Sequence, residues 1–136
     1  MAAAEDTHVF DGGCLCGAVR FRVEGALRPV IYCHCEQCRR TSGHFVAASA
    51  ADDNAITLTR DDGLRWFASS DTAKRGFCDH CGSSLFWKQH SSDQTSIMAG
   101  ALDDKTVLTA ERHIFVDDKA AYYTLDDQLP RNAADV

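Results

Sequence analysis

Seven cysteines are the residues of this chain whose type and spacing are best suited to chemistry. They form three groups: Cys14 and Cys16 in "GGCLCG", Cys33, Cys35 and Cys38 in "CHCEQC", and Cys78 and Cys81 in "FCDHCG". A disulfide framework fits poorly, because the count is odd and neighbours such as Cys14 and Cys16 do not readily bridge each other. Clustered thiolates favour zinc in tetrahedral coordination, so we predict zinc sites.

The spacing within each group suggests how the thiols could converge. Side chains alternate along an extended segment, so Cys14 and Cys16 can point to one side with Leu15 turned away. By the same alternation, His34 should turn away from the cysteines on either side of it. The third group has the C-x-x-C spacing of a tight turn, and Gly82 after it can adopt a positive φ.

Seven thiols divide most simply into four that close a structural zinc site and three that leave a position open, as catalytic zinc sites do. In one division, Cys14, Cys16, Cys78 and Cys81 close the site, and Cys33, Cys35 and Cys38 form the open one. In the other division, Cys35, Cys38, Cys78 and Cys81 close the site, and Cys14, Cys16 and Cys33 remain. We prefer the first, because the second separates its two C-x-x-C pairs by more than the usual interval of roughly 15–20 residues.

A histidine is the alternative fourth ligand for the open group, since structural zinc sites commonly combine cysteine and histidine. His44, shortly after Cys38, is the strongest candidate, and His80 could substitute within the third cysteine group. The other three histidines are expected in solvent or at the edge of the core: His8, His90 and His113.

Hydrophobic alternation predicts the elements that must position these groups. In "VRFRVEG", Val19, Phe21 and Val23 lie on one face of a strand that ends at Gly25. The segments "NAITLTR" and "LRWFAS" predict a hairpin around Asp61-Asp62-Gly63, and "EQCRRTSG" predicts a short helix that ends at Gly43. Further strands are predicted in "HFVAASA", "SSLFWKQ", "SIMAGAL" and "RHIFVDD". The chain is therefore expected to be all-β, a single and mainly antiparallel domain.

Length and charge narrow the classes of partner. The 136 residues suit one domain with its core at about 8–130, and the first seven residues and the tail "RNAADV" are expected to fray. The net charge of −6 argues against nucleic acid and anionic lipid as partners. Neither a signal peptide nor a membrane span is evident, so we expect a cytoplasmic protein. The sequence does not predict an oligomeric state.

Three segments, "GGCLCGAVRF", "CHCEQCRRTSG" and "RGFCDHCGSSLFW", resemble in order and spacing the family of glutathione-dependent formaldehyde-activating enzymes and centromere protein V. The later "HIFVDDKAAYY" is similar to the family's closing segment, although that segment often has Pro-Trp where this chain has Ala121-Tyr122. The resemblance runs from about Gly12 to Pro130.

The resemblance implies a β-tent fold of short antiparallel sheets with two zinc ions. The structural zinc would be held by the residues matching the family's first set, Cys14, Cys16, Cys78 and Cys81. The catalytic zinc would be held by Cys33, Cys35 and Cys38. The implied activity is that of a carbon–sulfur lyase, in the type case the condensation of formaldehyde with glutathione.

An open zinc site with three thiolates carries a net charge near −1 and is a weak Lewis acid, so hydrolysis by zinc-bound hydroxide is not favoured. A substrate thiol as the fourth ligand fits better: it would be held as a thiolate and could add to a carbonyl carbon. Four basic residues could bind a carboxylate of that thiol or simply balance charge: Arg39, Arg40, Lys74 and Arg75. The competing hypothesis is a non-enzymatic zinc module that binds another protein.

Overall fold

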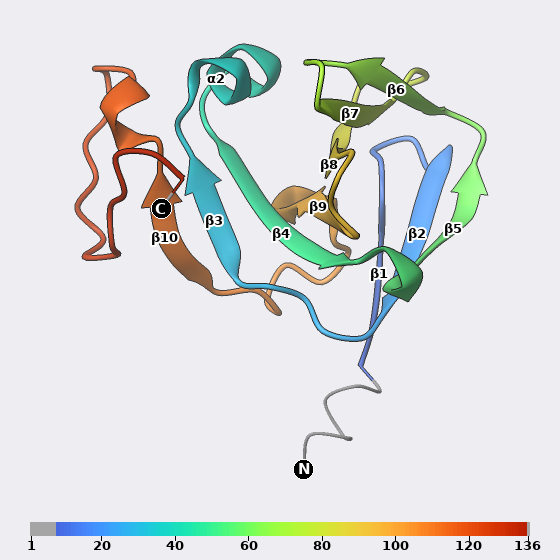
Figure 1. Ribbon diagram of the computed structural model, residues 1–136. Coiled ribbons are helices and arrows are strands. Elements are labelled where there is room, and N and C mark those ends of the chain that lie inside the picture. Colours follow the sequence, from blue (N-terminus) through green and yellow to red (C-terminus); the bar gives the residue numbers. More distant parts are fainter. Residues whose placement is uncertain (1–7, 136) are drawn as a thin grey trace.

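Residues 8–135 are described by the structure, a computed structural model, and form two sheets of short strands with one α-helix (Figure 1). The three-stranded sheet has the order β1-β2-β5, and the seven-stranded sheet has the order β10-β3-β4-β9-β8-β7-β6. The strands are β1 Val9–Gly13, β2 Val19–Glu24, β3 Val30–Cys33, β4 Val46–Asp52, β5 Ile56–Asp61, β6 Leu64–Ala68, β7 Ala73–Cys78, β8 Ser84–Gln89, β9 Gln94–Met98 and β10 Ala110–Ile114. The helix is α2 Glu36–Ser42, and the 3₁₀ turns are η1 Asp53–Ala55, η2 Ala99–Ala101 and η3 Val116–Asp118.

The all-β, mainly antiparallel prediction is confirmed. Among the strand pairs only β10 and β3 run parallel. None of the helices within residues 8–135 combines the length and apolar character needed to cross a membrane.

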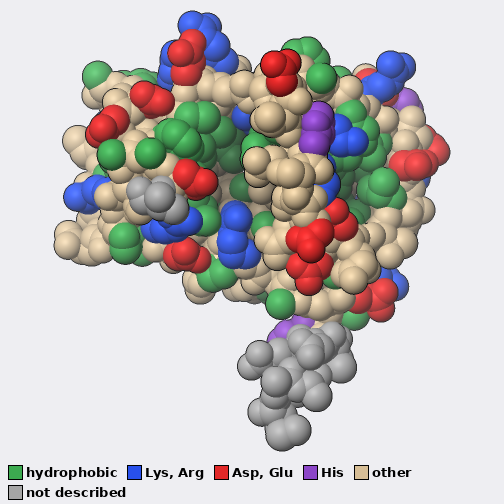
Figure 2. Space-filling view, in the orientation of Figure 1, with side chains coloured by type: hydrophobic (Ala, Val, Ile, Leu, Met, Phe, Trp, Pro, Cys, Tyr) green, Lys and Arg blue, Asp and Glu red, His purple; other side chains and the backbone are tan. Residues whose placement is uncertain are grey.

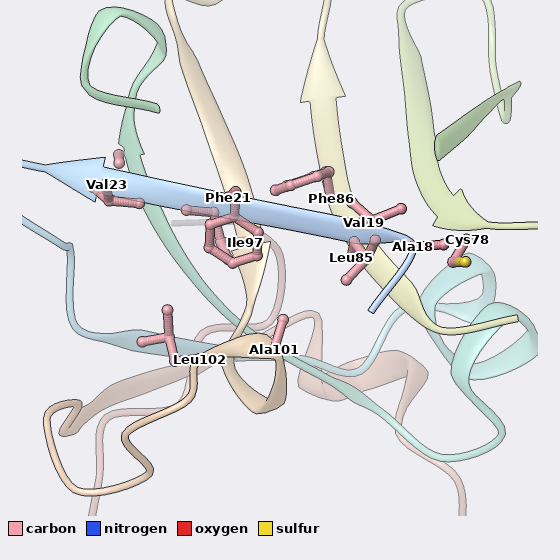
Figure 3. Packing of buried hydrophobic residues seen from close by; sticks show 11 residues of the cluster. Ala18, Val19, Phe21, Val23, Cys78, Leu85, Phe86, Ile97, Ala101 and Leu102 are labelled. Atoms are coloured by element: carbon pink, nitrogen blue, oxygen red, sulfur yellow. The ribbon is translucent and has the colours of Figure 1, made fainter. Parts of the chain in front are cut away.

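The main core lies between the two sheets, where β2 crosses the middle of the seven-stranded sheet (Figure 3). Val19, Phe21 and Val23 are almost fully buried, as their alternation predicted. They pack in one cluster with Leu85 of β8 and Ile97 of β9. The period-two pattern thus places one face of β2 in the core and leaves its charged face to solvent.

The opposite face of the seven-stranded sheet is the one that carries the cavity described below. Across β3, β4 and β9, Ile31 pairs with Ala48 and Ala48 with Met98, so these three side chains share that face. Ile97, the neighbour of Met98, points the other way into the core. The sheet therefore separates the main core from the cavity.

The helix α2 lies where it was predicted. Its N-cap, Cys35, accepts a hydrogen bond from the Cys38 amide, and Gly43 ends it with a φ of 86°. A left-handed residue after a helix is usually glycine because a Cβ there is unfavourable.

The predicted hairpin of residues 54–69 is wrong. β5 pairs with β2 and β6 pairs with β7, so the turn at Gly63 carries the chain from one sheet to the other. Two long-range backbone bonds hold this turn: the Gly63 amide donates to the Ala18 carbonyl at 3.3 Å, and the Asp79 amide donates to the Gly63 carbonyl at 2.7 Å. These contacts come from residues distant in sequence, which local alternation cannot reveal.

The expectation that the C-terminal tail frays is also wrong for residues 131–135. The Asn132 amide donates to His113 at 2.9 Å, and Phe115 donates to Ala134 at 3.1 Å. The tail thus covers the edge strand β10, whose unpaired amides would otherwise be exposed. The first seven residues, also expected to fray, lie outside the described part of the chain.

Candidate metal centres

Cys14, Cys16, Cys78 and Cys81 come together where the β1–β2 connection meets the β7–β8 turn. Their four sulfurs lie within 4.8 Å of one another, with Cys14 3.7 Å from Cys16 and Cys16 3.8 Å from Cys78. A tetrahedron of sulfurs, each about 2.3 Å from a central zinc, has edges of about 3.8 Å. The donor set and its dimensions therefore fit zinc.

Hydrogen bonds from the surroundings favour thiolates in this four-thiol group. The Val19 amide donates to the Cys14 sulfur at 3.3 Å. The Ser83 hydroxyl lies 3.2 Å from the Cys81 sulfur and accepts from the Leu15 amide at 3.1 Å, so it bridges the two halves of the group. The hydrogen bond with Ser83 is the main reason why the pKa of Cys81 falls to about 5.

Cys33, Cys35 and Cys38, which we call the trio, form the second group, at the junction of β3 and α2. Their sulfurs also lie within 4.8 Å of one another. The contact with Cys33 lowers the pKa of Cys35 to about 2, and the same contact raises the pKa of Cys33. One negative charge in the trio thus opposes a second, and a bound cation would allow all three thiols to ionise.

The seven cysteines therefore lie as in the first of the two divisions, and all seven are free thiols. Neither group includes a histidine among residues 8–135. His44 bonds instead to the Tyr122 hydroxyl, and the exposed His80 lies 3.5 Å from Asp79.

A cavity of about 540 Å³ lies beside the trio on the open face of the seven-stranded sheet. Its apolar walls include Ile31, Val46, Trp87, Met98 and Phe115. Three arginines also line it: Arg28, Arg75 and Arg112. The enclosure has the size and mixed lining of a small-molecule site.

Only one of the four predicted carboxylate-binding residues, Arg75, lines this cavity. Arg40 pairs with Glu36 at 3.1 Å, Lys74 lies over the Trp66 ring, and Arg39 is not in the lining. Sequence reasoning missed Arg28 and Arg112. Arg112 could have been found, because it begins the predicted strand "RHIFVDD". Its side chain and that of the adjacent His113 should point to opposite faces of the sheet.

His34 turns away from the trio, as predicted, into a network with His113, which is also buried, with the partly buried Tyr123 and with the exposed Asp127. The Tyr123 hydroxyl lies 2.6 Å from His34 Nδ1, His34 Nε2 lies 2.9 Å from His113 Nδ1, and His113 Nε2 lies 2.8 Å from Asp127. His113, expected at the surface or core edge, is only 2% exposed. Its long-range partners explain why that expectation is wrong.

When both histidine rings are neutral, the network has one consistent direction of donation. His113 lowers the pKa of the Asp127 carboxyl, whose ionised form only accepts. His113 therefore donates through Nε2 and accepts through Nδ1 from His34. Burial lowers the pKa of His34 to about 4, so its neutral ring accepts from the Tyr123 hydroxyl.

Surface charge is mixed on the face shown in Figure 2, where acidic and basic side chains are scattered among hydrophobic and other groups. The described residues on that face form no continuous basic surface of the kind that binds nucleic acid.

Comparison with known proteins supports the resemblance. The family model described as "Glutathione-dependent formaldehyde-activating enzyme" matches residues 9–118. An uncharacterized lyase of Schizosaccharomyces pombe is 28% identical over 116 residues, covering 84% of this chain and 83% of the relative. A putative glutathione-dependent formaldehyde-activating enzyme of Halomonas elongata is 26% identical over 135 residues, covering 88% of this chain and 83% of the relative.

The fold has a counterpart among solved structures. A crystal structure of a Rhodobacter sphaeroides protein superposes with a TM-score of 0.56 at 26% identity, covering 68% of this chain and 87% of the other. The family model spans most of this chain, including all seven cysteines. The chain therefore belongs to the family of glutathione-dependent formaldehyde-activating enzymes.

Proposed function

We propose that this protein is a zinc-dependent carbon–sulfur lyase that joins a small thiol to an aldehyde, such as formaldehyde, or separates them again. One observation carries the proposal: three of the seven thiols line the cavity of about 540 Å³, while the other four form a separate group whose dimensions fit zinc. The names of the family and of the relatives support the same chemistry.

Two zinc ions per chain are part of this proposal. Cys14, Cys16, Cys78 and Cys81 would hold a structural zinc with a complete set of four ligands. Cys33, Cys35 and Cys38 would hold a catalytic zinc, which would supply a fourth position for the substrate's sulfur and lower the pKa of that thiol.

The reaction breaks two bonds, the S–H bond of the thiol and the π bond of the carbonyl, and forms two, a C–S bond and an O–H bond. The S–H bond of the thiol breaks, a bond forms between sulfur and the carbonyl carbon, and the proton ends on the former carbonyl oxygen. The apolar walls of the cavity would exclude water, which strengthens the charge interactions within it. Arg28 and Arg112 are the residues we assign to bind carboxylates of a glutathione-like thiol.

Matched serine substitutions in the two cysteine groups test the proposal. We expect Cys35→Ser to bind one zinc instead of two, to keep the fold, and to lose the acceleration of adduct exchange. That exchange can be followed by NMR with glutathione and formaldehyde. Cys16→Ser changes the same atom in the other group and should chiefly lower thermal stability.

Two results would count against the proposal. Full exchange activity in Cys35→Ser would exclude the trio from the reaction. Unfolding of Cys35→Ser, with no acceleration of exchange by the wild type, would favour a non-enzymatic zinc module that binds another protein.

A further inference from the structure

Arg75 places a buried positive charge against the trio. Arg75 lies on β7 and is 8% exposed, and its side chain points toward α2. Its Nη2 donates to the Gln37 side-chain oxygen at 3.0 Å and lies 3.8 Å from the Cys38 sulfur. Its Nε also donates to the same Gln37 oxygen, at 3.3 Å. The guanidinium is thus held between a neutral amide and a thiol ligand.

This charge has no carboxylate partner in the part of the chain that the structure describes. None of the ion pairs within residues 8–135 includes Arg75. A guanidinium stays protonated in proteins, and a charge buried without a partner destabilises the folded chain. Among the described contacts of Arg75, the Cys38 sulfur is the group that would carry the opposing charge when the trio holds a metal.

We propose that Arg75 is the counter-ion of the trio and a positioning residue for the metal held there. The inference rests on the proposed function, because it requires a cation bound by Cys33, Cys35 and Cys38. Three thiolates and Zn²⁺ carry a net charge of −1, which one guanidinium neutralises. Gln37 fixes the orientation of Arg75, and Arg75 acts on the metal through the Cys38 sulfur.

The role differs from substrate binding, because the Arg75 guanidinium contacts the Cys38 sulfur itself and is oriented there by Gln37. A charge-assisted hydrogen bond to a ligand sulfur draws electron density from it and holds it in place. Loss of the guanidinium should therefore weaken metal binding at the trio and make the Cys38 thiolate more electron-rich. Neither effect should reach the four-thiol group, which includes no contact with Arg75 among the described hydrogen bonds.

The test compares Arg75→Met with the wild type and with Arg40→Met. Arg40 carries the same side chain on α2, 68% exposed and paired with Glu36, so it serves as a matched control. Zinc affinity is measured by competition with a chromophoric chelator on the full chain. We expect the weaker of the two zinc sites to lose about 10- to 100-fold in affinity in Arg75→Met, as loss of an outer-shell partner typically does. The tighter site and the Arg40→Met protein should be unchanged.

A spectroscopic measurement distinguishes an electronic effect of Arg75 on the Cys38 sulfur from a contribution of Arg75 to packing alone. In Co²⁺-loaded Arg75→Met, the sulfur-to-cobalt charge-transfer band of the trio should move to longer wavelength, because a more electron-rich thiolate is easier to oxidise. Arg75→Lys keeps the charge and should recover part of the affinity. If Arg75→Met does not fold, Gln37→Leu removes the oxygen that orients the guanidinium and should lower the affinity in the same direction.

The outcomes distinguish this inference from the proposed function. One zinc per wild-type chain would overturn both. Two zincs per wild-type chain, with affinity and cobalt spectrum unchanged in Arg75→Met, would overturn the role of Arg75 alone. If Arg75→Met does not fold, unchanged zinc affinity in Gln37→Leu would likewise overturn the role of Arg75.

Discussion

At the scale of single residues, His34 shows how one segment serves two sides of a sheet. Cys33 and Cys35 face the cavity, while His34 between them is 1% exposed and bonds to Tyr123 and His113. A histidine between two cysteines looks like a metal ligand by type, yet alternation alone was enough to exclude it. The residues that hold His34 fix the peptide that carries two thiols of the trio.

Removing the Tyr123 hydroxyl should therefore destabilise the protein. In Tyr123→Phe the buried Nδ1 of His34 loses its donor, and an unsatisfied buried group costs about 1–3 kcal/mol. Urea unfolding at neutral pH measures the difference in free energy of unfolding.

The neighbouring Tyr122→Phe is the control, because Tyr122 is 66% exposed and its hydroxyl bonds to the exposed His44. Its change in stability should stay within about 0.5 kcal/mol, as for most surface substitutions. An equal loss of stability in the two variants would show that the hydrogen bond between Tyr123 and His34 contributes no more than the exposed one between Tyr122 and His44.

Residue-level prediction succeeded where the determinants were local. The convergence of Cys33, Cys35 and Cys38 follows from a strand that runs directly into a helix turn. The partners of His34 lie 79 and 89 residues away in sequence, and no periodicity connects them. Long-range pairing between strands decides such contacts, and a single sequence does not display it.

At the scale of elements, the turn at Gly63 is the junction of the two sheets. β5 before it belongs to the three-stranded sheet and β6 after it to the seven-stranded sheet. Both strands were predicted from their alternation, but their pairing with each other was not correct. Two strands separated by a short turn form a hairpin only if neither finds a better partner, and here β2 and β7 are those partners.

A side chain at this junction should disturb both the fold and the four-thiol group. A Cβ at Gly63 would lie 2.7 Å from the Cys78 sulfur and 3.1 Å from the Ala18 Cβ. We expect Gly63→Ala to lower the free energy of unfolding by about 1–3 kcal/mol, the usual cost of overpacking. Thermal unfolding of the zinc-loaded protein measures it.

Gly100→Ala is the matched control, since a Cβ there has no neighbour within 4 Å. It should leave the melting temperature and the zinc content unchanged. A Gly63→Ala protein as stable as Gly100→Ala would mean that the junction can widen without cost.

The C-terminal tail is a second element whose role depends on pairing. A chain that ends at Pro130 loses three backbone hydrogen bonds of the tail. They run from Asn132 to His113, from Phe115 to Ala134 and from Val116 to Asn132. At a net contribution of roughly 1 kcal/mol each, the loss should be about 3 kcal/mol. Urea unfolding checks this against a chain that ends at Asp135, which keeps all three bonds and should keep its stability. Equal stability of the two chains would refute the pairing.

At the scale of the whole molecule, the two cysteine groups have different structural positions. The four-thiol group joins the β1–β2 connection of one sheet to the β7–β8 turn of the other. The trio belongs to β3 and α2 alone and faces the cavity. Metal bound by four thiols would thus cross-link the sheets, whereas metal in the trio would hold one strand–helix junction.

Chelation should consequently proceed in two steps. We expect a chelator to remove the zinc of the trio first, with the circular dichroism spectrum unchanged. The second zinc should leave only at higher chelator concentration and together with loss of cooperative thermal unfolding, because binding free energy of a structural zinc is also folding free energy. Release of both ions in one step, with unfolding, would contradict a separation of roles.

The sheet that divides the core from the cavity has a practical consequence for protein engineering. Within residues 119–129, the Tyr123 hydroxyl bonds to His34, which lies between Cys33 and Cys35, and the Asp127 carboxylate bonds to His113, the other partner of His34. Random libraries confined to these positions would vary the placement of the thiols without altering any wall of the cavity. Directed evolution could therefore adjust turnover independently of substrate preference, because none of residues 119–129 lines the cavity.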